Sequence, residues 1–145
     1  MDALPEEYPP WVPRLLEDTP VASLLGAQAI SCDAASGVFR IGFEGKDAFC
    51  NMLGVLQGGI VTTMLDMAMS LSAIVRMGPD SRVPTLEMKT TFLAPARPGR
   101  LVAEGWPVRT GKTICFMEGR LLDPDGAVLA TASGTARVWR VREGP

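Results

Sequence analysis

The stretch GVLQGGIVTTMLDMAM, residues 54–69, decides the fold of this chain. It contains a glycine pair, Gly58-Gly59, and continues as an apolar run to residue 75. Apolar residues recur in this run at helical spacing, and its other faces are nearly as apolar, which is typical of a buried helix. Gly78-Pro79 is expected to end it. We therefore predict one long buried helix over about residues 60–75.

A single charged residue, Asp66, interrupts this helix. It is the only formal charge between residues 48 and 75. A carboxylate in such surroundings is costly unless it is paired or protonated. Because its sequence neighbours are apolar, we expect them to desolvate it. Such a carboxylate can act as a general base or as a nucleophile, and the sequence leaves both roles open. The structural alternative is a carboxylate that is simply hydrogen-bonded to a threonine or an asparagine.

The segments on either side of the helix are predicted to be strands. Residues 27–32 and 38–43 are part-alternating apolar runs around the turn sequence DAASG, which indicates a hairpin. After the helix, period-two alternation predicts four strands in a meander, at residues 85–92, 101–110, 113–122 and 127–139. Turns at Gly111-Lys112 and at DPDG, residues 123–126, separate the last three. Strands around a single helix indicate the α+β class, with an antiparallel sheet wrapped around that helix.

The N-terminal segment has a different composition from the rest of the chain. Residues 1–20 contain five prolines and several acidic groups, so residues 1–25 are predicted to be a lead-in with short helices at 12–17 and 21–25. We see no linker or repeat, and residues 1–145 are predicted to form one domain. The chain start is unlike a signal peptide, and three widely spaced cysteines do not suggest a disulfide framework. A cytoplasmic protein is therefore expected.

The composition excludes several classes of function. The chain has no histidine, which rules out Ser–His–Asp and Cys–His catalysis and histidine zinc sites, and it has no CxxC motif. A net charge of −2 offers no basic face for nucleic acid. The apolar run is shorter than a bilayer span, so no membrane partner is expected. An enzyme of this composition is expected to use carboxylates, hydroxyls, amides and backbone N–H groups, without a metal or a cofactor.

The glycine pair suggests a second chemical element. The first N–H groups of a helix have no partners within the helix, and they attract negative charge. Glycines allow a ligand carbonyl to come close to that backbone. We therefore assign the Gly58 N–H to oxyanion binding and Gly59 to substrate contact. A simple turn before the helix is the alternative.

Five residues form a spaced motif, N-x5-Q-G-G-x6-D: Asn51, Gln57, Gly58, Gly59 and Asp66. It resembles the signature of acyl-CoA thioesterases of the phenylacetate-pathway (PaaI-like) type, an asparagine, then His-Gly-Gly, then an aspartate. The segments TLEMKTTFLAPARPG, residues 85–99, and GKT, residues 111–113, are also similar to that family. The resemblance implies a hotdog fold and hydrolysis of an acyl- or aryl-CoA to free acid and coenzyme A. Gln57 is a departure, because most members have histidine there, although related hydroxybenzoyl-CoA thioesterases can use glutamine near this place.

Further residues receive expected roles. The resemblance implies that Thr85, in the strand after the helix, assists near the carboxylate. Asn51 is expected to orient the water or the thioester, and Gln57 to donate to the carbonyl oxygen; helix capping is the alternative for both. Lys112 and Arg97 lie near predicted turns or strand ends and are expected to contact the phosphates of coenzyme A. A solvated turn lysine is the alternative for Lys112.

The spacing of the motif predicts a site shared between subunits. Gly58 and Asp66 are eight residues apart, which is roughly 12 Å along one helix. One carbonyl cannot easily contact both residues in a single chain, so each is expected to come from a different subunit. The resemblance implies the same, with a homodimer or a dimer of dimers.

Two alternatives to a thioesterase keep the same fold. One is a non-catalytic acyl-CoA-binding or interaction module, in which the missing histidine at position 57 marks lost hydrolysis. The other is a hotdog dehydratase, which is less favoured because those enzymes commonly use histidine.

Overall fold

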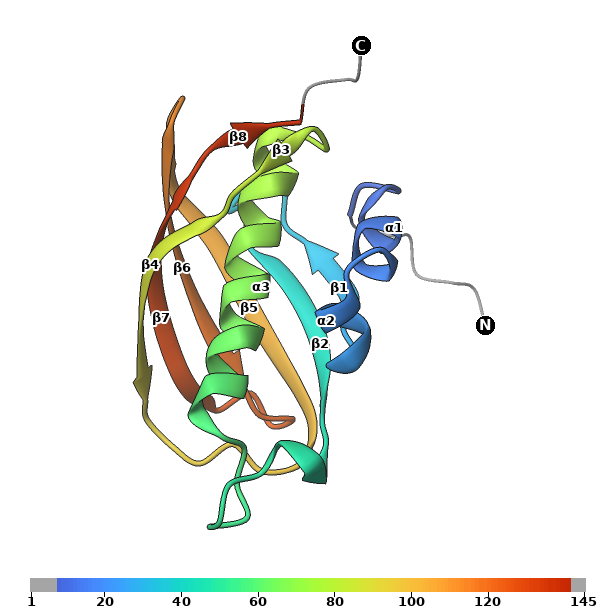
Figure 1. Ribbon diagram of the computed structural model, residues 1–145, viewed down its shortest axis with the longest axis vertical. Helices are drawn as coiled ribbons and strands as arrows, with labels where there is room; N and C mark the ends of the chain where they lie inside the picture. Colours follow the sequence, from blue (N-terminus) through green and yellow to red (C-terminus); the bar gives the residue numbers. More distant parts are fainter. Residues whose placement is uncertain (1–7, 142–145) are drawn as a thin grey trace.

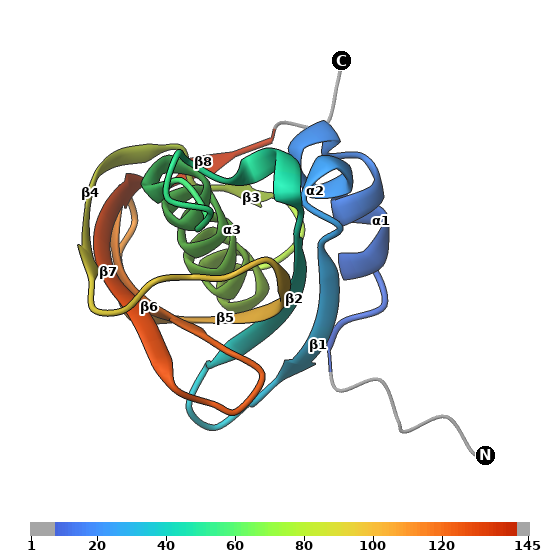
Figure 2. The ribbon, with the colours of Figure 1, turned by 90° about the horizontal axis from the view of Figure 1, so that it is seen from below.

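The computed structural model describes residues 8–141. Residues 1–7 and 142–145, which belong to the predicted single domain, lie outside the described residues. In the described part, an antiparallel sheet curves around one long helix, α3 (Gly58–Met77), as Figures 1 and 2 show. The α+β class and the sheet wrapped around a central helix are confirmed.

The sheet contains six strands. They are β1 (Gln28–Cys32), β2 (Phe39–Gly45), β4 (Thr85–Phe92), β5 (Gly99–Thr110), β6 (Ile114–Leu122) and β7 (Val128–Arg137). The shorter elements are α1 (Val12–Glu17), α2 (Pro20–Leu24), the 3-10 helix η1 (Asp47–Phe49) and the paired strands β3 (Ser81–Arg82) and β8 (Trp139–Arg140). The two predicted N-terminal helices and the predicted hairpin are therefore present, while η1, β3 and β8 are additions that the alternation did not predict.

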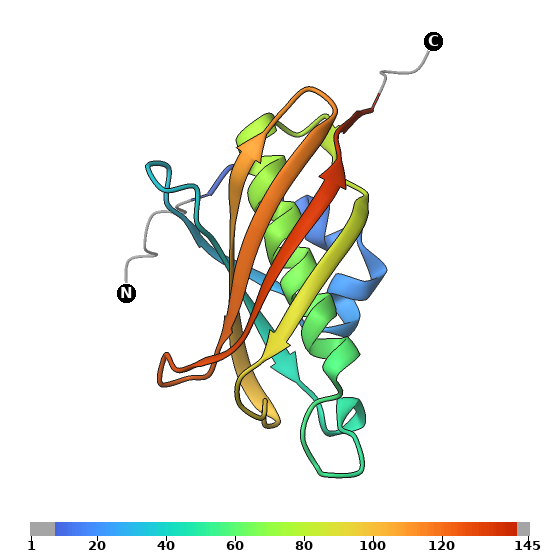
Figure 3. The same ribbon diagram turned by 90° about the vertical axis from the view of Figure 1, so that its left-hand side faces the viewer.

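The order of strands corrects the predicted four-strand meander. The sheet runs β1-β2-β5-β6-β7-β4, so β5, β6 and β7 form a meander but β4 does not join it. β4 pairs with β7 and lies at the edge of the sheet, whereas β5 pairs with β2 (Figure 3). The chain between β4 and β5 passes below the start of α3, which separates the two strands in space (Figure 1). Alternation identifies strands, but it does not identify their neighbours.

The sheet covers one side of α3, and this corrects the prediction of a helix buried all round. Nine of its twenty residues are buried, among them Val61, Met64, Leu65, Ala68 and Met69. Asp66 is among the residues that are only half-buried. Within residues 8–141, α3 is the one helix whose length and apolar composition match a membrane span, a test that the core helix of a soluble protein also passes. The opposite side of α3 is thus left accessible within one chain.

The contact between α3 and β5 depends on a glycine, and we predict the effect of filling it. A Cβ added at Gly105 would overlap the carbonyl group of Ala68 and lie 2.6 Å from the backbone nitrogen of Met69. Helix backbone cannot move aside like a side chain, so Gly105→Ala should lower the free energy of unfolding by about 1–3 kcal/mol or more. Urea unfolding measures this. Gly59→Ala is the control, because a Cβ there meets nothing within 4 Å. Equal stability of Gly105→Ala and wild type would contradict the prediction.

Candidate functional site

The first turn of α3 presents two free backbone donors. The Ile60 and Val61 N–H groups both donate to the Gln57 carbonyl, at 2.9 and 3.2 Å. The Gly58 and Gly59 N–H groups have no backbone acceptor among the described residues. These donors lie at the positive end of the helix dipole, where a developing negative charge is stabilised.

An aromatic ring packs directly against the first glycine. A Cβ at Gly58 would lie 3.1 Å from Cζ of Phe92 and 3.4 and 3.6 Å from two other ring atoms. Phe92 ends β4 and is half-exposed, so its ring borders the approach to the Gly58 backbone. Alternation along β4 places Phe92 on the inner face, but its position beside Gly58 follows only from the way β4 crosses α3. Sequence reasoning missed this residue.

A cavity of about 370 Å³ opens at the same place. Its walls are mostly apolar, and the larger apolar side chains that line it are Leu56, Val61, Phe92, Leu93 and Leu129. Asn51 supplies the polar side chain of the lining. The size falls in the range of small-molecule sites, and apolar walls with few polar groups are typical of them. The cavity therefore suits an uncharged hydrocarbon group whose carbonyl reaches the Gly58 N–H.

The two polar residues before α3 differ in their local roles. The Asn51 Oδ1 accepts the Leu53 N–H at 2.9 Å, so Asn51 caps a turn of its own loop rather than the helix. This bond fixes the direction of the amide group. Gln57 is the N-cap residue of α3, but its exposed side chain makes no capping hydrogen bond. The alternative prediction that the side chains of Asn51 and Gln57 cap the helix is therefore wrong.

Asp66 is held by a hydroxyl from β4. The Thr85 hydroxyl donates to Asp66 Oδ1 at 2.7 Å, and the Thr62 hydroxyl donates to Thr90 at 3.1 Å one helical turn earlier. These bonds link α3 to β4. Among the described residues, Oδ2 of Asp66 has no hydrogen-bond donor, so one carboxylate oxygen is positioned while the other stays available to a water or an acyl carbon.

The expected desolvation of Asp66 by its sequence neighbours stays a prediction, because the side chain is half-buried in the structure. Met64 and Leu65 are fully buried, whereas Asp66 is half-buried beside the edge strand β4, where Thr85 bonds to it. Successive residues of a helix point about 100° apart, so neighbours in sequence need not surround one another. Any further burial of this carboxylate has to come from outside the described residues.

The two halves of the candidate site stay apart in a single chain. Gly58 and Asp66 lie on the same straight helix, roughly 12 Å apart along its axis, and Asp66 does not line the cavity beside Gly58. Lys112 and Arg97 are also separated. Lys112 lies in the turn between β5 and β6, and Arg97 lies just before β5, so the length of that strand, about 40 Å, divides them (Figure 1).

Thiol and metal chemistry find little support in the described residues. Burial raises the pKa of the Cys115 thiol and of the Cys32 thiol, so both are neutral rather than nucleophilic thiolates near pH 7. Residues 8–141 hold no cluster of three or more histidine, cysteine or acidic side chains that could bind a metal. The chemistry within reach is that of a carboxylate, backbone donors and an apolar cavity.

A six-stranded antiparallel sheet wrapped around one long central helix is the hotdog fold. The chain belongs to the thioesterase superfamily, because residues 53–130 match that family over more than half of the chain. This membership favours hydrolysis over a binding module or a dehydratase.

Individual relatives agree with this assignment. A candidate esterase of Saccharolobus solfataricus is 30% identical over 122 residues, which are 84% of this chain and 85% of that protein. The crystal structure of a candidate thioesterase of Ralstonia eutropha JMP134, a phenylacetic acid degradation-related protein, is 30% identical, with a TM-score of 0.78 over 88% of this chain and 98% of that one. The PaaI protein of the E. coli phenylacetic acid degradation operon shares the fold, at a TM-score of 0.78 and 18% identity over 90% and 91% of the two chains. The predicted likeness to hotdog thioesterases of the PaaI type is confirmed.

Proposed function

We propose that this protein is an acyl-CoA thioesterase that hydrolyses an apolar acyl- or aryl-CoA to the free acid and coenzyme A. The observation that carries the proposal is the half-buried Asp66 carboxylate, held by Thr85 of the edge strand β4. The apolar cavity beside Gly58 supports an uncharged hydrocarbon acyl group. We also infer a cytoplasmic location, in keeping with three free cysteines.

The reaction assigns one role to each half-site. The thioester carbonyl oxygen accepts the Gly58 N–H, which stabilises the oxyanion as it forms. Asp66 either takes a proton from a water that attacks the carbonyl carbon or attacks that carbon itself to give an acyl anhydride. The carbon–sulfur bond then breaks and coenzyme A leaves as the thiolate. We assign Asn51, which lines the cavity, to orienting the water or the thioester, and Gln57, the N-cap residue of α3, to donating to the carbonyl oxygen.

A second copy of the chain is proposed to bring the half-sites together. β4 is an edge strand whose outer side has no partner among the described residues, and Leu86 and Leu93 on or beside it are exposed. Unprotected edges of this kind favour pairing with another strand. If two β4 strands pair antiparallel about their centres, Thr85 of one chain lies opposite Phe92 of the other.

This pairing joins the parts of the site in space. Phe92 touches Gly58, and Thr85 holds Asp66, while paired strands are about 4.8 Å apart. The oxyanion donor of one subunit thus comes beside the carboxylate of its partner, and the partner covers the open side of α3. The same two-fold rotation brings Arg97 of one subunit to the end of the sheet where the partner carries Lys112. Arg97 and Lys112 are far apart within one chain, but in the proposed dimer Arg97 of one subunit and Lys112 of the other could contact the same coenzyme A.

Thiol release from a panel of acyl-CoAs tests the proposed activity. We expect turnover of straight-chain acyl-CoA or phenylacetyl-CoA and poor turnover of succinyl-CoA, whose carboxylate would be buried without a partner. Saturable binding of every member without release of thiol would contradict the proposed hydrolysis.

Mixing two inactive variants tests whether the site is shared. In an equal mixture of Asp66→Asn and Gly58→Ala, half of the dimers contain one of each, and one of their two sites combines Gly58 with Asp66. We therefore expect recovery of about a quarter of wild-type activity after exchange of subunits. Each variant alone serves as the control. A mixture no more active than its components would contradict a site built across two subunits.

A further inference from the structure

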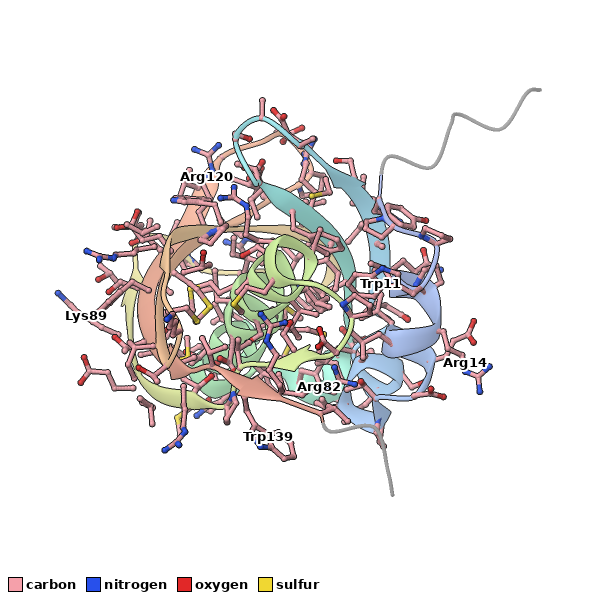
Figure 4. All side chains as sticks on the ribbon, turned by 90° about the horizontal axis from the view of Figure 1, so that it is seen from above. Trp11, Arg14, Arg82, Lys89, Arg120 and Trp139 are labelled. Carbon is pink, nitrogen blue, oxygen red and sulfur yellow. The ribbon has the colours of Figure 1, made fainter. Side chains whose placement is uncertain are left out.

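An exposed tryptophan occupies the end of the fold opposite to the start of α3. Trp139 lies on β8, and 59% of its surface is exposed. Figure 4, which looks down on this end of the molecule, shows Trp139 extending away from the body while Arg82 lies closer to it. Neither the core nor the proposed reaction uses this side chain.

Two cations that lack a partner within the described residues lie on, or beside, the segment that carries Trp139. Arg137 precedes Trp139 by two residues and pairs across the sheet with Ile114. The Val138 N–H donates to the Thr113 carbonyl at 2.7 Å, which places Lys112 beside the same segment. Arg137 and Lys112 are exposed, and no ion pair of either is present in residues 8–141.

Three other charged residues of the described β3 and β8 region are already engaged. Arg140 pairs with Asp80 at 2.9 Å, and Arg82 donates to the carbonyls of Pro79 and Ser81 at 2.9 and 2.7 Å. The Asp80 carboxylate is thus neutralised by Arg140. Within residues 8–141, the uncompensated charge near Trp139 is positive.

Trp139 and the two free cations lie near the half of the candidate site that contains Asp66. Thr85, which holds Asp66, pairs with Ala136, and Arg82 pairs with Trp139. The Thr85–Ala136 pair and the Arg82–Trp139 pair are three residues apart along the chain, which is about 10 Å along a strand. A ligand that reaches Asp66 with one end can therefore rest on Trp139 with the other.

We propose that Trp139 is the platform on which the adenine ring of the acyl-CoA stacks, with Lys112 and Arg137 contacting its phosphates. This inference rests on the proposed function. A nucleotide combines a planar ring with negative charge, and an exposed aromatic ring beside free cations matches both. The acyl group and the pantetheine arm require neither an aromatic ring to stack on nor cations. The nucleotide is separated from the thioester by that arm, which fits its placement away from Asp66.

Comparison of a full and a truncated substrate tests the platform. Trp139→Ala should raise KM for octanoyl-CoA about tenfold, with kcat nearly unchanged, because stacking of one base contributes this much to binding. The same variant should leave hydrolysis of octanoyl-pantetheine, which lacks the nucleotide, unchanged. Leu24→Ala is the matched control, since Leu24 is a comparably exposed apolar residue of α2, 55% exposed.

Binding of free coenzyme A by calorimetry provides a readout that does not depend on hydrolysis. Weaker binding by Trp139→Ala, and retention of most binding by Trp139→Phe, would support the platform even if no tested thioester were turned over. Equal binding by wild type and Trp139→Ala would overturn it. An equal loss of activity toward both octanoyl substrates would also overturn it, because Trp139 would then support the fold or the assembly rather than the nucleotide.

Discussion

Asp66→Asn is expected to lower kcat for thioester hydrolysis by about 10²–10⁴-fold, the range that general acid–base catalysis supplies. An amide neither accepts the proton of the attacking water nor attacks the acyl carbon. Its oxygen still accepts the Thr85 hydroxyl, and the side chain keeps its size, so the fold should be retained. Thiol release measured beside a urea unfolding curve separates lost chemistry from lost structure.

Asp18→Asn is a suitable control for this loss. Asp18 is an exposed carboxylate of the N-terminal region that pairs with Arg14, and its removal should leave turnover unchanged. Full activity of Asp66→Asn would contradict the role of the carboxylate.

A single turnover of the wild-type enzyme in oxygen-18 water separates the general-base mechanism from the nucleophilic one. Attack by water on the thioester labels the product acid, whereas hydrolysis of an anhydride at the Asp66 carbonyl labels the protein.

Gly58→Ala is expected to lower kcat/KM by about 10²-fold, comparable to the loss of one oxyanion donor. The new methyl group would lie 3.1 Å from the Phe92 ring, in the space through which the carbonyl approaches the backbone. The N–H itself remains, so the predicted effect comes from crowding. Steady-state kinetics on the preferred acyl-CoA measures it.

Gly59→Ala provides the matched comparison. It adds the same methyl group one residue later, where nothing lies within 4 Å, and it keeps the N–H that is expected to contact the substrate, so it should lose less activity than Gly58→Ala. If crowding is the cause, the double variant Gly58→Ala, Phe92→Leu should regain part of the lost rate. Equal losses in Gly58→Ala and Gly59→Ala would contradict the special position of Gly58.

The local patterns of the chain predicted most elements of the fold. Helical spacing located α3, alternation located β4 to residues 85–92, and turn sequences separated the later strands. Local preferences suffice there because each pattern reflects which side chains must be buried. The same patterns did not place β4 at the edge beside β7, because strand pairing depends on contacts between residues distant in sequence.

The candidate site divides in the same way. The motif from Asn51 to Asp66 and the absence of histidine predict carboxylate and backbone chemistry, since residue type determines which groups can react. The spacing of Gly58 and Asp66 on one helix was sufficient to separate them, because the rise of a helix is fixed.

Tertiary structure decided what surrounds these residues. The packing of the edge strand β4 beside α3 lets the half-buried Asp66 meet Thr85, whereas Met64 and Leu65 are fully buried. The crossing of β4 over α3 places Phe92 against Gly58, and the pairing of β3 with β8 exposes Trp139 at the far end. The sequence by itself determined which chemical groups this protein has and how far apart they lie along α3. Their environment was decided by the packing of distant strands on that helix, which no local pattern encodes.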